Sequence, residues 1–587
     1  MLDLARDPRW SRVEETMGED PYLSGVLGAA MVQGMGNQPY STAATLKHFI
    51  GYGSSEGGLN GVRTMVGERE LRQMLMPQFK QVIDAGARSV MTAYNTIDGI
   101  PCTSNRALIT DVLRGEWGFK NGLVVSDLYS IDVIHNTHHV AASKLDAAIA
   151  AFNAGVDIDL GGNCYSQLSE AIDKGLVTME QLNRAVSRVL RLKFEMGLFE
   201  NPYVDTSAAS VGVHDSTAVS VARQVAQASI TLLKDNGVLP LRKDARVAIV
   251  GPNANNVYNQ LGDYTAPQPD DKVITVYEGI KAMLPQGYCK YVKGCAVRDS
   301  AVCDIEAVVK VANEADVVIT VVGGSSARDF RTSYEDTGAA IIEQQIVSDM
   351  ECGEGFDRAT LALLGRQNEL LTALKQTGKP LVVVYIEGRP LEKNWADENA
   401  DALLTAYYPG EQGGAAIADV LFGDYNPAGR LPISVPRHEG QIPVYYNRPA
   451  PLHDYVEMLY TPLYPFGFGL SYTTFAYSDL DITEDGNNGY NVSFTLTNTG
   501  DCCGDEVVQL YVHDRVASVV QPDRQLKAFD RITLNAGQSR RVTLHLDHAA
   551  LAIVDADMHW TVEHGTFDIL VGASSTDIRL KGTITVK

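Results

Sequence analysis

The stretch that most constrains the fold is GLVVSDLYSID, residues 122–132. Its apolar run 123–125 indicates a short strand that is covered on both faces, as in a parallel sheet. The strand ends abruptly at Ser126 and Asp127. In a β/α barrel the residues just past the carboxyl ends of the strands carry the chemistry. Asp127 is therefore a candidate catalytic carboxylate, and the alternative is that it only caps the next helix.

Strands and helices alternate through the first 199 residues, which predicts a parallel α/β sheet of the (β/α)8-barrel type. The expected strands are Thr42–Phe49, Ser89–Asn95, Leu123–Asp127 and Val156–Leu160, with a stub at Met1–Leu4. Helices are expected at 68–86, 106–119 and 144–155 between them. These are five strands where a closed barrel has eight. We therefore expect the barrel to be incomplete at its N-terminus, and the chain to be a fragment of a longer natural protein.

Beyond the barrel-type domain (1–199) the pattern changes twice. A polar segment, 200–216, is predicted to be a linker. Residues 217–440 contain four apolar runs that end in Gly or Pro with helices between them, which predicts a second parallel sheet in an α/β sandwich. After a Pro- and Tyr-rich connector, 441–475, alternation with a period of two predicts a C-terminal β-sandwich over 476–587.

Charge and composition exclude several classes of partner. The net charge of −23 argues against nucleic acid and anionic lipid, and suits a neutral ligand. No apolar run is long enough to span a membrane. The eight cysteines form no CxxC pair, so zinc is not expected, and the Gly-rich turns match no nucleotide-binding motif, so no cofactor is expected. Cys289, Cys295 and Cys303 either form one disulfide or stay free thiols.

Polar side chains gather at the predicted ends of the barrel strands. A metal site is a poor explanation, because the only His there, His48, follows the cationic Lys47. Hydrogen-bond donors around one carboxylate suit a neutral polyhydroxylated ligand. The donors expected to keep that carboxylate ionised are Arg12, Lys47 and Tyr94.

A second carboxylate would complete the pair that hydrolysis of a glycosidic bond requires. The segment DMECGEGFDR offers Glu351 and Glu354 in a Gly-flanked loop. Exposed acidic loops are usually only solvated, so the residues alone leave this assignment open.

Motifs along the whole chain resemble those of glycoside hydrolase family 3, a family of retaining β-glucosidases and β-xylosidases. They keep the family's order, and the family's barrel, α/β sandwich and fibronectin type III-like domain agree with the three parts described above. The matching segments are LDLARDPRWSRVEETMGEDPY (2–22), LKHFIGYG (46–53), VGERELRQMLMPQF (66–79), VMTAYNTIDGIPCTSN (90–105), GLVVSDLYSI (122–131), GEGFDR (353–358), GRLPISVP (429–436) and LYPFGFGLSYTTF (463–475).

The resemblance implies a role for each candidate residue. Asp127 would be the nucleophile that forms the glycosyl-enzyme, and Glu354 the general acid/base. The residues expected to bind the terminal sugar are Arg12, Lys47, His48 and Tyr94. Asp157 and Asp159 are the rivals for the nucleophile, and Glu351 is the rival for the acid/base.

The chain departs from the family pattern at several places. Leu59 stands where many relatives carry Arg, and Leu128 where they often carry Trp. The loop IGYGSSEGG has no His, which argues against the branch that cleaves N-acetylglucosaminides. A carboxylate that binds the sugar's O4 is expected in the part of the barrel that would precede Met1.

The expected activity is exo-hydrolysis of β-linked glucose or xylose from the non-reducing ends of small oligosaccharides, without a cofactor. Two alternatives stay open: a catalytically impaired carbohydrate-binding or scaffold protein, and a phosphorylase on the same fold. The oligomeric state is open, with a homodimer among the options. A periplasmic or secreted location is favoured over a cytoplasmic one.

Overall fold

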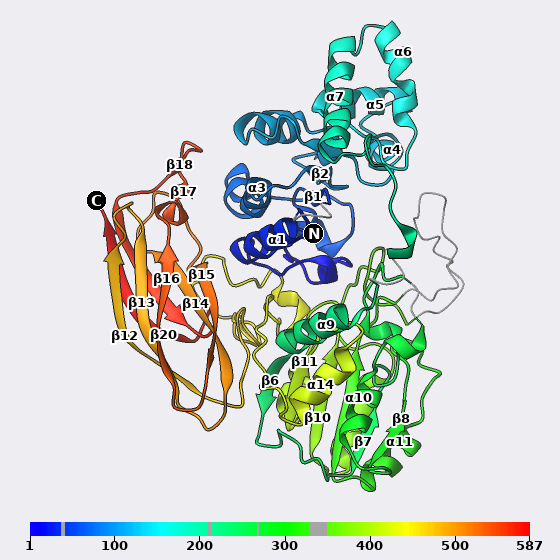
Figure 1. Cartoon of the computed structure of the whole chain (residues 1–587), viewed down its shortest axis with the longest axis vertical. Coiled ribbons are helices and arrows are strands. Elements are labelled where there is room, and N and C mark those ends of the chain that lie inside the picture. Colours follow the sequence, from blue (N-terminus) through cyan, green and yellow to red (C-terminus); the bar gives the residue numbers. More distant parts are fainter. Residues whose placement is uncertain (37–41, 209–212, 267–268, 328–348) are drawn as a thin grey trace. The chain divides into compact units, whose positions relative to one another are not determined.

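The computed structural model describes residues 1–36, 42–208, 213–266, 269–327 and 349–587 (Figure 1). The chain divides into two compact units, Met1–Ser210 and Val211–Lys587. Each unit is described here by itself.

The N-terminal unit is built around a parallel sheet in which three strands follow one another in chain order. These strands are β1 (Thr45–Phe49), β2 (Ser89–Thr92) and β5 (Leu123–Val125). All three residues of β5 are buried, so the prediction of a short covered strand before Asp127 is confirmed. β3 (Thr96–Ile97) and β4 (Ile100–Pro101) form a small hairpin after β2.

Two of the expected strands are not strands. Val156–Leu160 is reduced to one parallel bridge between Val125 and Ile158. The reason is that side chains replace ladder partners on both sides: the Asp157 carboxylate accepts the Val124 N–H at 3.0 Å, and the Ser126 hydroxyl accepts the Leu160 N–H at 2.8 Å. The stub at Met1–Leu4 has no strand geometry either, although the Leu2 N–H donates to the Lys47 carbonyl at 2.7 Å.

The helices predicted between these strands are present, and two of them contain wide π-helical turns. The helix after Ser143 begins with a cap, because the Ser143 hydroxyl accepts the Asp146 N–H at 3.2 Å, and it ends at Gly155 with φ +112°. The helices of this unit are α1 (Pro21–Gly36), α2 (Glu68–Glu70), the π-helix Leu71–Leu75, α3 (Pro77–Asp84), the π-helix Ala107–Glu116, α4 (Ser130–Asn136), α5 (Lys144–Ala154), α6 (Leu168–Asp173) and α7 (Met179–Glu195).

The C-terminal unit begins with a six-stranded sheet in the order β6-β11-β10-β9-β7-β8. The four predicted strands are confirmed, but the expectation of a purely parallel sheet is wrong, because β6 runs antiparallel to β11. The two missed strands, β6 and β8, lie at the sheet edges and lack a long apolar run. The strands are β6 (Thr231–Asp235), β7 (Val247–Val250), β8 (Cys289–Val292), β9 (Val317–Gly323), β10 (Leu381–Ile386) and β11 (Ala402–Thr405).

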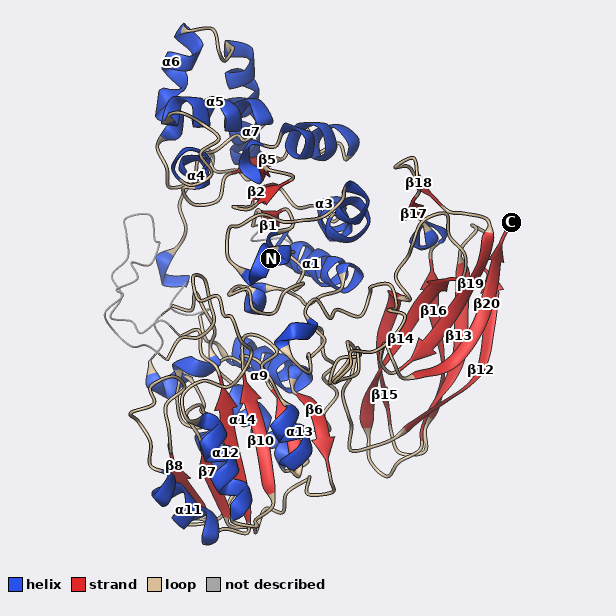
Figure 2. Cartoon of the chain, turned by 180° about the vertical axis from the view of Figure 1, so that it is seen from behind, coloured by secondary structure: helices blue, strands red, loops and turns tan. Residues whose placement is uncertain are grey.

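Helices cover both faces of this sheet. In Figure 1, α9 (Ser216–Ser229), α10 (Val276–Met283) and α14 (Gly413–Leu421) lie over one face. Figure 2 shows the opposite face, which α11 (Ile305–Asn313), α12 (Gln367–Gln376) and α13 (Asn394–Asn399) cover. Each face has its own apolar core, as expected for strands buried on both sides.

The predicted β-sandwich is also present, as two antiparallel sheets around one core. On β13 every second residue is buried, which is the alternation seen in the sequence. The first sheet consists of β12 (Phe475–Glu484), β13 (Tyr490–Asn498) and β16 (Ser539–Leu546), and the second of β15 (Gln525–Leu534), β14 (Gly504–Asp514), β19 (Gly565–Gly572) and β20 (Ile578–Val586). β17 (Ile553–Val554) and β18 (Trp560–Thr561) pair beside them.

An ion pair is buried where β10 ends. Lys393 and Glu387 have side chains that are 0% and 1% exposed, and they lie 2.7 Å apart. The Thr405 hydroxyl and the Leu391 N–H also donate to the Glu387 carboxylate, at 2.6 and 3.0 Å. The lysine also lies over the Tyr385 ring, 4.4 Å from its centroid. Every partner of the carboxylate is thus supplied by the turn after β10 or by β11.

We predict that Lys393→Met lowers the free energy of unfolding by about 3–5 kcal/mol, because it leaves the Glu387 carboxylate buried without a counter-charge. The matched control is Lys290→Met, which removes an exposed partner of Glu314 and should cost at most about 1 kcal/mol. Urea denaturation of both variants measures the difference. Equal losses for the two variants would contradict the prediction.

Candidate active site

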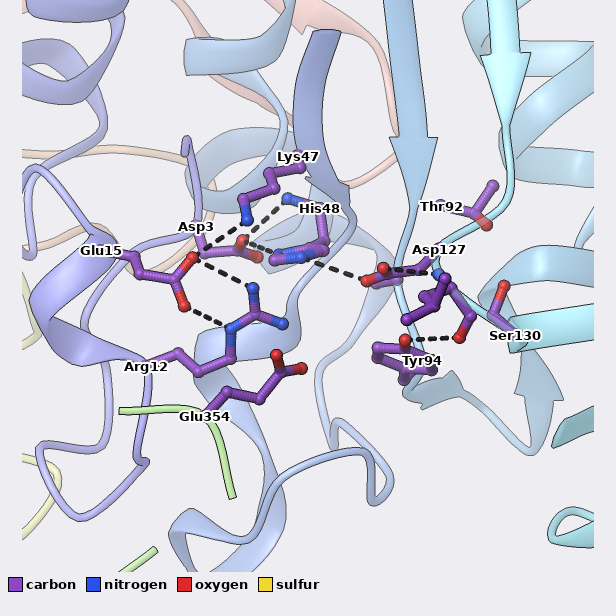
Figure 3. A network of polar contacts seen from close by, with 12 residues as sticks. Asp3, Arg12, Glu15, Lys47, His48, Thr92, Tyr94, Asp127, Ser130 and Glu354 are labelled. Atoms are coloured by element: carbon purple, nitrogen blue, oxygen red, sulfur yellow. Dashed lines mark hydrogen bonds and ion pairs between the residues drawn. The ribbon is translucent and has the colours of Figure 1, made fainter. Parts of the chain in front are cut away.

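Asp127 lies two residues past the end of β5 and is buried. Its Oδ1 accepts the Leu128 N–H at 2.7 Å, and its Oδ2 lies 3.2 Å from Nε2 of His48 (Figure 3). Burial acts to raise the pKa of Asp127, but the contact with His48 and the charge of Arg12 outweigh it and hold that pKa below its usual range. Asp127 is thus an ionised carboxylate in a largely desolvated place.

His48 connects Asp127 to a second carboxylate, Asp3. The Asp3 Oδ2 lies 3.0 Å from Nδ1 of the His48 ring and also accepts the His48 backbone N–H at 2.8 Å. The ring is fully buried, and it packs edge-on against Tyr52 with centroids 4.9 Å apart. Nε2 and the Asp127 Oδ2 face each other without hydrogen-bond alignment. Both atoms are buried and have no hydrogen bond of good geometry among the described residues.

Arg12 and Lys47 converge on Glu15, which the sequence analysis did not single out. The Arg12 guanidinium contacts the two carboxylate oxygens of Glu15 at 2.5 and 3.0 Å, and the Lys47 Nζ lies 3.0 Å from one of them. Burial acts to raise the pKa of Glu15, but hydrogen bonding to Arg12 and the two positive charges lower it to about 2. Glu15 thus holds both cations in place, as Figure 3 shows.

Tyr94 lies beside the same turn but does not donate to Asp127. Its hydroxyl donates to the Leu128 backbone carbonyl at 2.6 Å. Lys47 likewise contacts Glu15 rather than Asp127. The expectation that Tyr94 and Lys47 donate directly to Asp127 is therefore wrong, because the Leu128 N–H and the His48 ring occupy those positions. Arg12 acts on the Asp127 pKa through its charge.

Asp157 and Asp159, the two alternative candidates for the nucleophile, have surroundings that differ from those of Asp127. Asp157 is 1% exposed and lies between Arg114 and Arg188, at 2.7 Å from each. Asp159 accepts the Tyr165 N–H at 3.2 Å, and burial raises its pKa. Asp157 is fully engaged in ion pairs that hold the turn after α5, and Asp159 is shifted toward its neutral form. Neither environment suits an ionised nucleophile.

Glu351 and Glu354 belong to the C-terminal unit and also differ from each other. The Glu351 side chain is 1% exposed, 2.8 Å from Arg358 and 3.5 Å from Arg389. Glu354 is only half-buried: its N–H donates to Asp263 at 3.0 Å, and its carboxylate accepts a hydrogen bond from Tyr264. Glu351 therefore anchors the loop, and Glu354 presents its carboxylate.

The backbone conformation of the loop around Glu354 depends on two glycines. Gly353 and Gly355 have φ values of +92° and +90°, in the region that favours glycine. Arg389 holds the loop in place, because its guanidinium donates to the backbone carbonyls of Glu351 and Phe356, at 2.9 Å in each case. The loop is thus held by its backbone while the Glu354 side chain stays accessible.

Among the described residues no group of three or more His, Cys, Asp or Glu side chains is arranged to hold a metal ion. Within the same ranges no helix has both the length and the apolar content to cross a membrane. All eight cysteines are free thiols, so the disulfide considered among residues 289, 295 and 303 does not form.

Three family models match the chain along its length. The Glycosyl hydrolase family 3 N terminal domain matches residues 1–192, and the Glycosyl hydrolase family 3 C-terminal domain matches 230–472. A Fibronectin type III-like domain matches 506–575. The three matches occur in the order that the motifs predicted.

Individual proteins match over nearly the whole chain. A periplasmic beta-glucosidase of Salmonella typhimurium is 38% identical over 99% of this chain and 79% of its own length. A beta-xylosidase of Formosa agariphila is 38% identical over 99% of this chain and 82% of its own. The crystal structure of a beta-glucosidase from Listeria innocua in complex with glucose superposes with a TM-score of 0.90 at 33% identity, covering 100% of this chain and 80% of that one.

The lowered pKa of Glu15 predicts a pH-dependent contribution to stability. A depressed carboxyl pKa stabilises the folded state above the unfolded value, near 4.5, and this stabilisation is lost as the pH falls toward about 2. At neutral pH the lowered pKa of Glu15 corresponds to a contribution of about 3 kcal/mol to the free energy of unfolding. Glu15→Gln should therefore melt well below the wild type at pH 7, and the gap should narrow at pH 3.

The matched control is Glu56→Gln, because Glu56 also pairs with an arginine, Arg63, but is exposed. Its melting temperature should follow that of the wild type across the range. Thermal melting between pH 3 and 7 measures all three proteins. A Glu15→Gln gap that does not change with pH would contradict the assignment.

Proposed function

This chain belongs to glycosyl hydrolase family 3, and on that premise we propose that it is an exo-acting retaining β-glycosidase. It removes terminal β-D-glucosyl or β-D-xylosyl residues from the non-reducing ends of oligosaccharides. The observation that carries this proposal is the ionised Asp127 carboxylate past β5, with Arg12, Lys47 and His48 grouped around it. Relatives named for both activities, each 38% identical, support both sugars, and the glucose-bound Listeria structure supports a sugar substrate.

Asp127 is the nucleophile in this proposal. Its carboxylate attacks the anomeric carbon, the bond to the leaving oxygen breaks, and a glycosyl ester on Asp127 forms. Its lowered pKa supports the role, because the carboxylate stays ionised well below neutral pH. The Leu128 N–H and the fixed His48 ring hold it in one orientation, and the Tyr94 hydroxyl fixes Leu128 in turn.

Glu354 is the general acid and base. In the first step it gives its proton to the leaving oxygen, and in the second it takes a proton from the water whose oxygen displaces Asp127. Support comes from its place in a Gly-flanked loop that Arg389 holds by the backbone. Glu351 is excluded in this proposal by its ion pairs with Arg358 and Arg389.

The residues proposed to bind the terminal sugar are donors held by carboxylates. Glu15 fixes Arg12 and Lys47, and Asp3 fixes the His48 ring. Guanidinium and ammonium groups are pure hydrogen-bond donors with several N–H groups each, which suits a ligand that is rich in hydroxyl groups. Donors fixed before the substrate arrives lose little freedom when they bind hydroxyl groups.

Two finer assignments complete the proposal. We propose that β1, β2 and β5 are consecutive strands of a β/α barrel, because they are parallel, adjacent and connected by helical segments. A periplasmic location is supported by the name of the Salmonella relative.

The first experiment tests the activity and the nucleophile together. The wild type should hydrolyse nitrophenyl β-glucoside or β-xyloside, and Asp127→Ala should lose more than about a thousandfold in kcat without a change in melting temperature. Asp159→Asn is the matched control, because Asp159 is a half-buried carboxylate of the same unit whose oxygen accepts the Tyr165 N–H, and it should keep most of the activity. Loss of activity in Asp159→Asn but not in Asp127→Ala would refute the assignment of Asp127 as the nucleophile.

The second experiment tests Glu354. Glu354→Ala should lose activity on substrates with poor leaving groups but still form the glycosyl-enzyme from activated aryl glycosides, which need little protonation. Added azide should then raise turnover and yield a β-glycosyl azide, the retained product.

Glu351→Gln provides the contrast in the same loop. It leaves Arg358 and Arg389 without their carboxylate, so it should lower the melting temperature and should not be rescued by azide. If Glu351→Gln forms a β-glycosyl azide and Glu354→Ala forms none, Glu351 is the acid/base and Glu354 is not.

A further inference from the structure

A hollow lies within the C-terminal unit, where the connector after residue 443 packs on the β-sandwich. Its volume is about 520 Å³ when the solvent-filled space at its mouth is included. All of its lining residues belong to this unit. The residues that matter for the argument are Tyr445, Tyr446, Tyr460, Arg448, Asp523 and Arg524.

The apolar part of the wall is aromatic and rigid. Tyr446 stacks on Phe466 with ring centroids 4.4 Å apart, and its hydroxyl accepts the Leu526 N–H at 2.8 Å. Tyr445 and Tyr460 are half-buried, and prolines fill the rest of this side. Flat aromatic rings with a polar tip offer both an apolar face and a hydrogen-bonding group.

The polar part of the wall consists of one ion pair, Asp523–Arg524, and of Arg448, which donates to backbone carbonyls. Both Nε and Nη2 of Arg524 donate to Asp523, at 2.9 and 2.5 Å, and its Nη1 donates to the Ser575 carbonyl at 2.5 Å. Arg448 donates to the carbonyls of Pro443 and Tyr460. These contacts fix planar donors and acceptors side by side on the wall.

We propose that this hollow is a second, non-catalytic binding site for a neutral oligosaccharide, which goes beyond the proposed hydrolysis. The aromatic faces suit the apolar C–H face of a pyranose ring, and the Asp523–Arg524 pair suits neighbouring hydroxyl groups, which need a donor and an acceptor together. The net charge of −23 of the chain disfavours an anion, and the donors of Arg448 in the wall contact backbone carbonyls. The site would hold a longer glycan while its end is hydrolysed elsewhere.

A proline-rich peptide is the main alternative occupant, because aromatic grooves also bind such segments. The observations favour a sugar, since peptide grooves of that kind rely chiefly on aromatic contacts, whereas here the Asp523–Arg524 ion pair also lines the hollow.

The test is native gel electrophoresis of the full chain in gels that contain a neutral soluble β-glucan or arabinoxylan. The wild type should be retarded, and Tyr460→Leu should bind about tenfold more weakly, because it keeps an apolar side chain but loses the aromatic ring. Tyr455→Leu is the matched control: Tyr455 lies in the same connector, is 42% exposed and does not line the hollow. Tyr445→Leu repeats the test should Tyr460→Leu not fold.

Hydrolysis of a nitrophenyl glycoside is measured on the same preparations and should be unchanged in all three variants. Retardation lost in Tyr460→Leu and Tyr445→Leu but kept in Tyr455→Leu supports the site, even if the chain proves inactive on aryl glycosides. Retardation that is absent from the wild type, or equal in all variants, overturns the site without touching the proposed activity. Tighter binding of a ten-residue polyproline peptide than of either glycan, lost in Tyr460→Leu, also overturns it.

Discussion

The position of the His48 ring between two carboxylates is the interaction on which the candidate active site depends. Asp3 holds one ring nitrogen and the backbone N–H of His48, and Asp127 faces the other nitrogen. The arrangement requires residue 3, the end of β1 and the end of β5 to meet, which the order β1-β2-β5 makes possible. Because charged groups are costly to bury without partners, this network accepts few other geometries. The site is therefore organised before a ligand arrives.

The contacts of each carboxylate, more than its position along the chain, separate the proposed catalytic residues from their neighbours. Asp127 and Asp157 both follow buried segments, yet Asp157 is paired with two arginines, whereas Asp127 faces the His48 ring and accepts the Leu128 N–H. A similar contrast separates Glu351, which is paired with Arg358, from Glu354 three residues later. In the proposed mechanism Asp157 and Glu351 hold the backbone that places Asp127 and Glu354.

The sequence predicted the parts of this structure that depend on local pattern. A buried apolar run followed by a polar residue located Asp127, and alternation of burial located β13 and its neighbours. It failed where a contact joins distant residues: Asp3 meets His48 across 45 positions, and nothing in the local pattern marks it. It also failed at Val156–Leu160, where the Asp157 side chain replaces a ladder partner of Val124. The ion pair of Glu15 with Arg12 could have been predicted, because the two residues are three positions apart.

The proposed active site and the hollow of the C-terminal unit use charged groups in different ways. Near Asp127 the contact with His48 and the charge of Arg12 outweigh the effect of burial and lower the pKa of the carboxyl. In the hollow Asp523 pairs with Arg524, while Arg448 donates to backbone carbonyls. A carboxylate that reacts as a nucleophile must stay ionised, and nearby donors and positive charge favour its ionised form. A site that only binds a neutral ligand has no such requirement, so the proposed task of the hollow needs its charged side chains only as hydrogen-bonding groups.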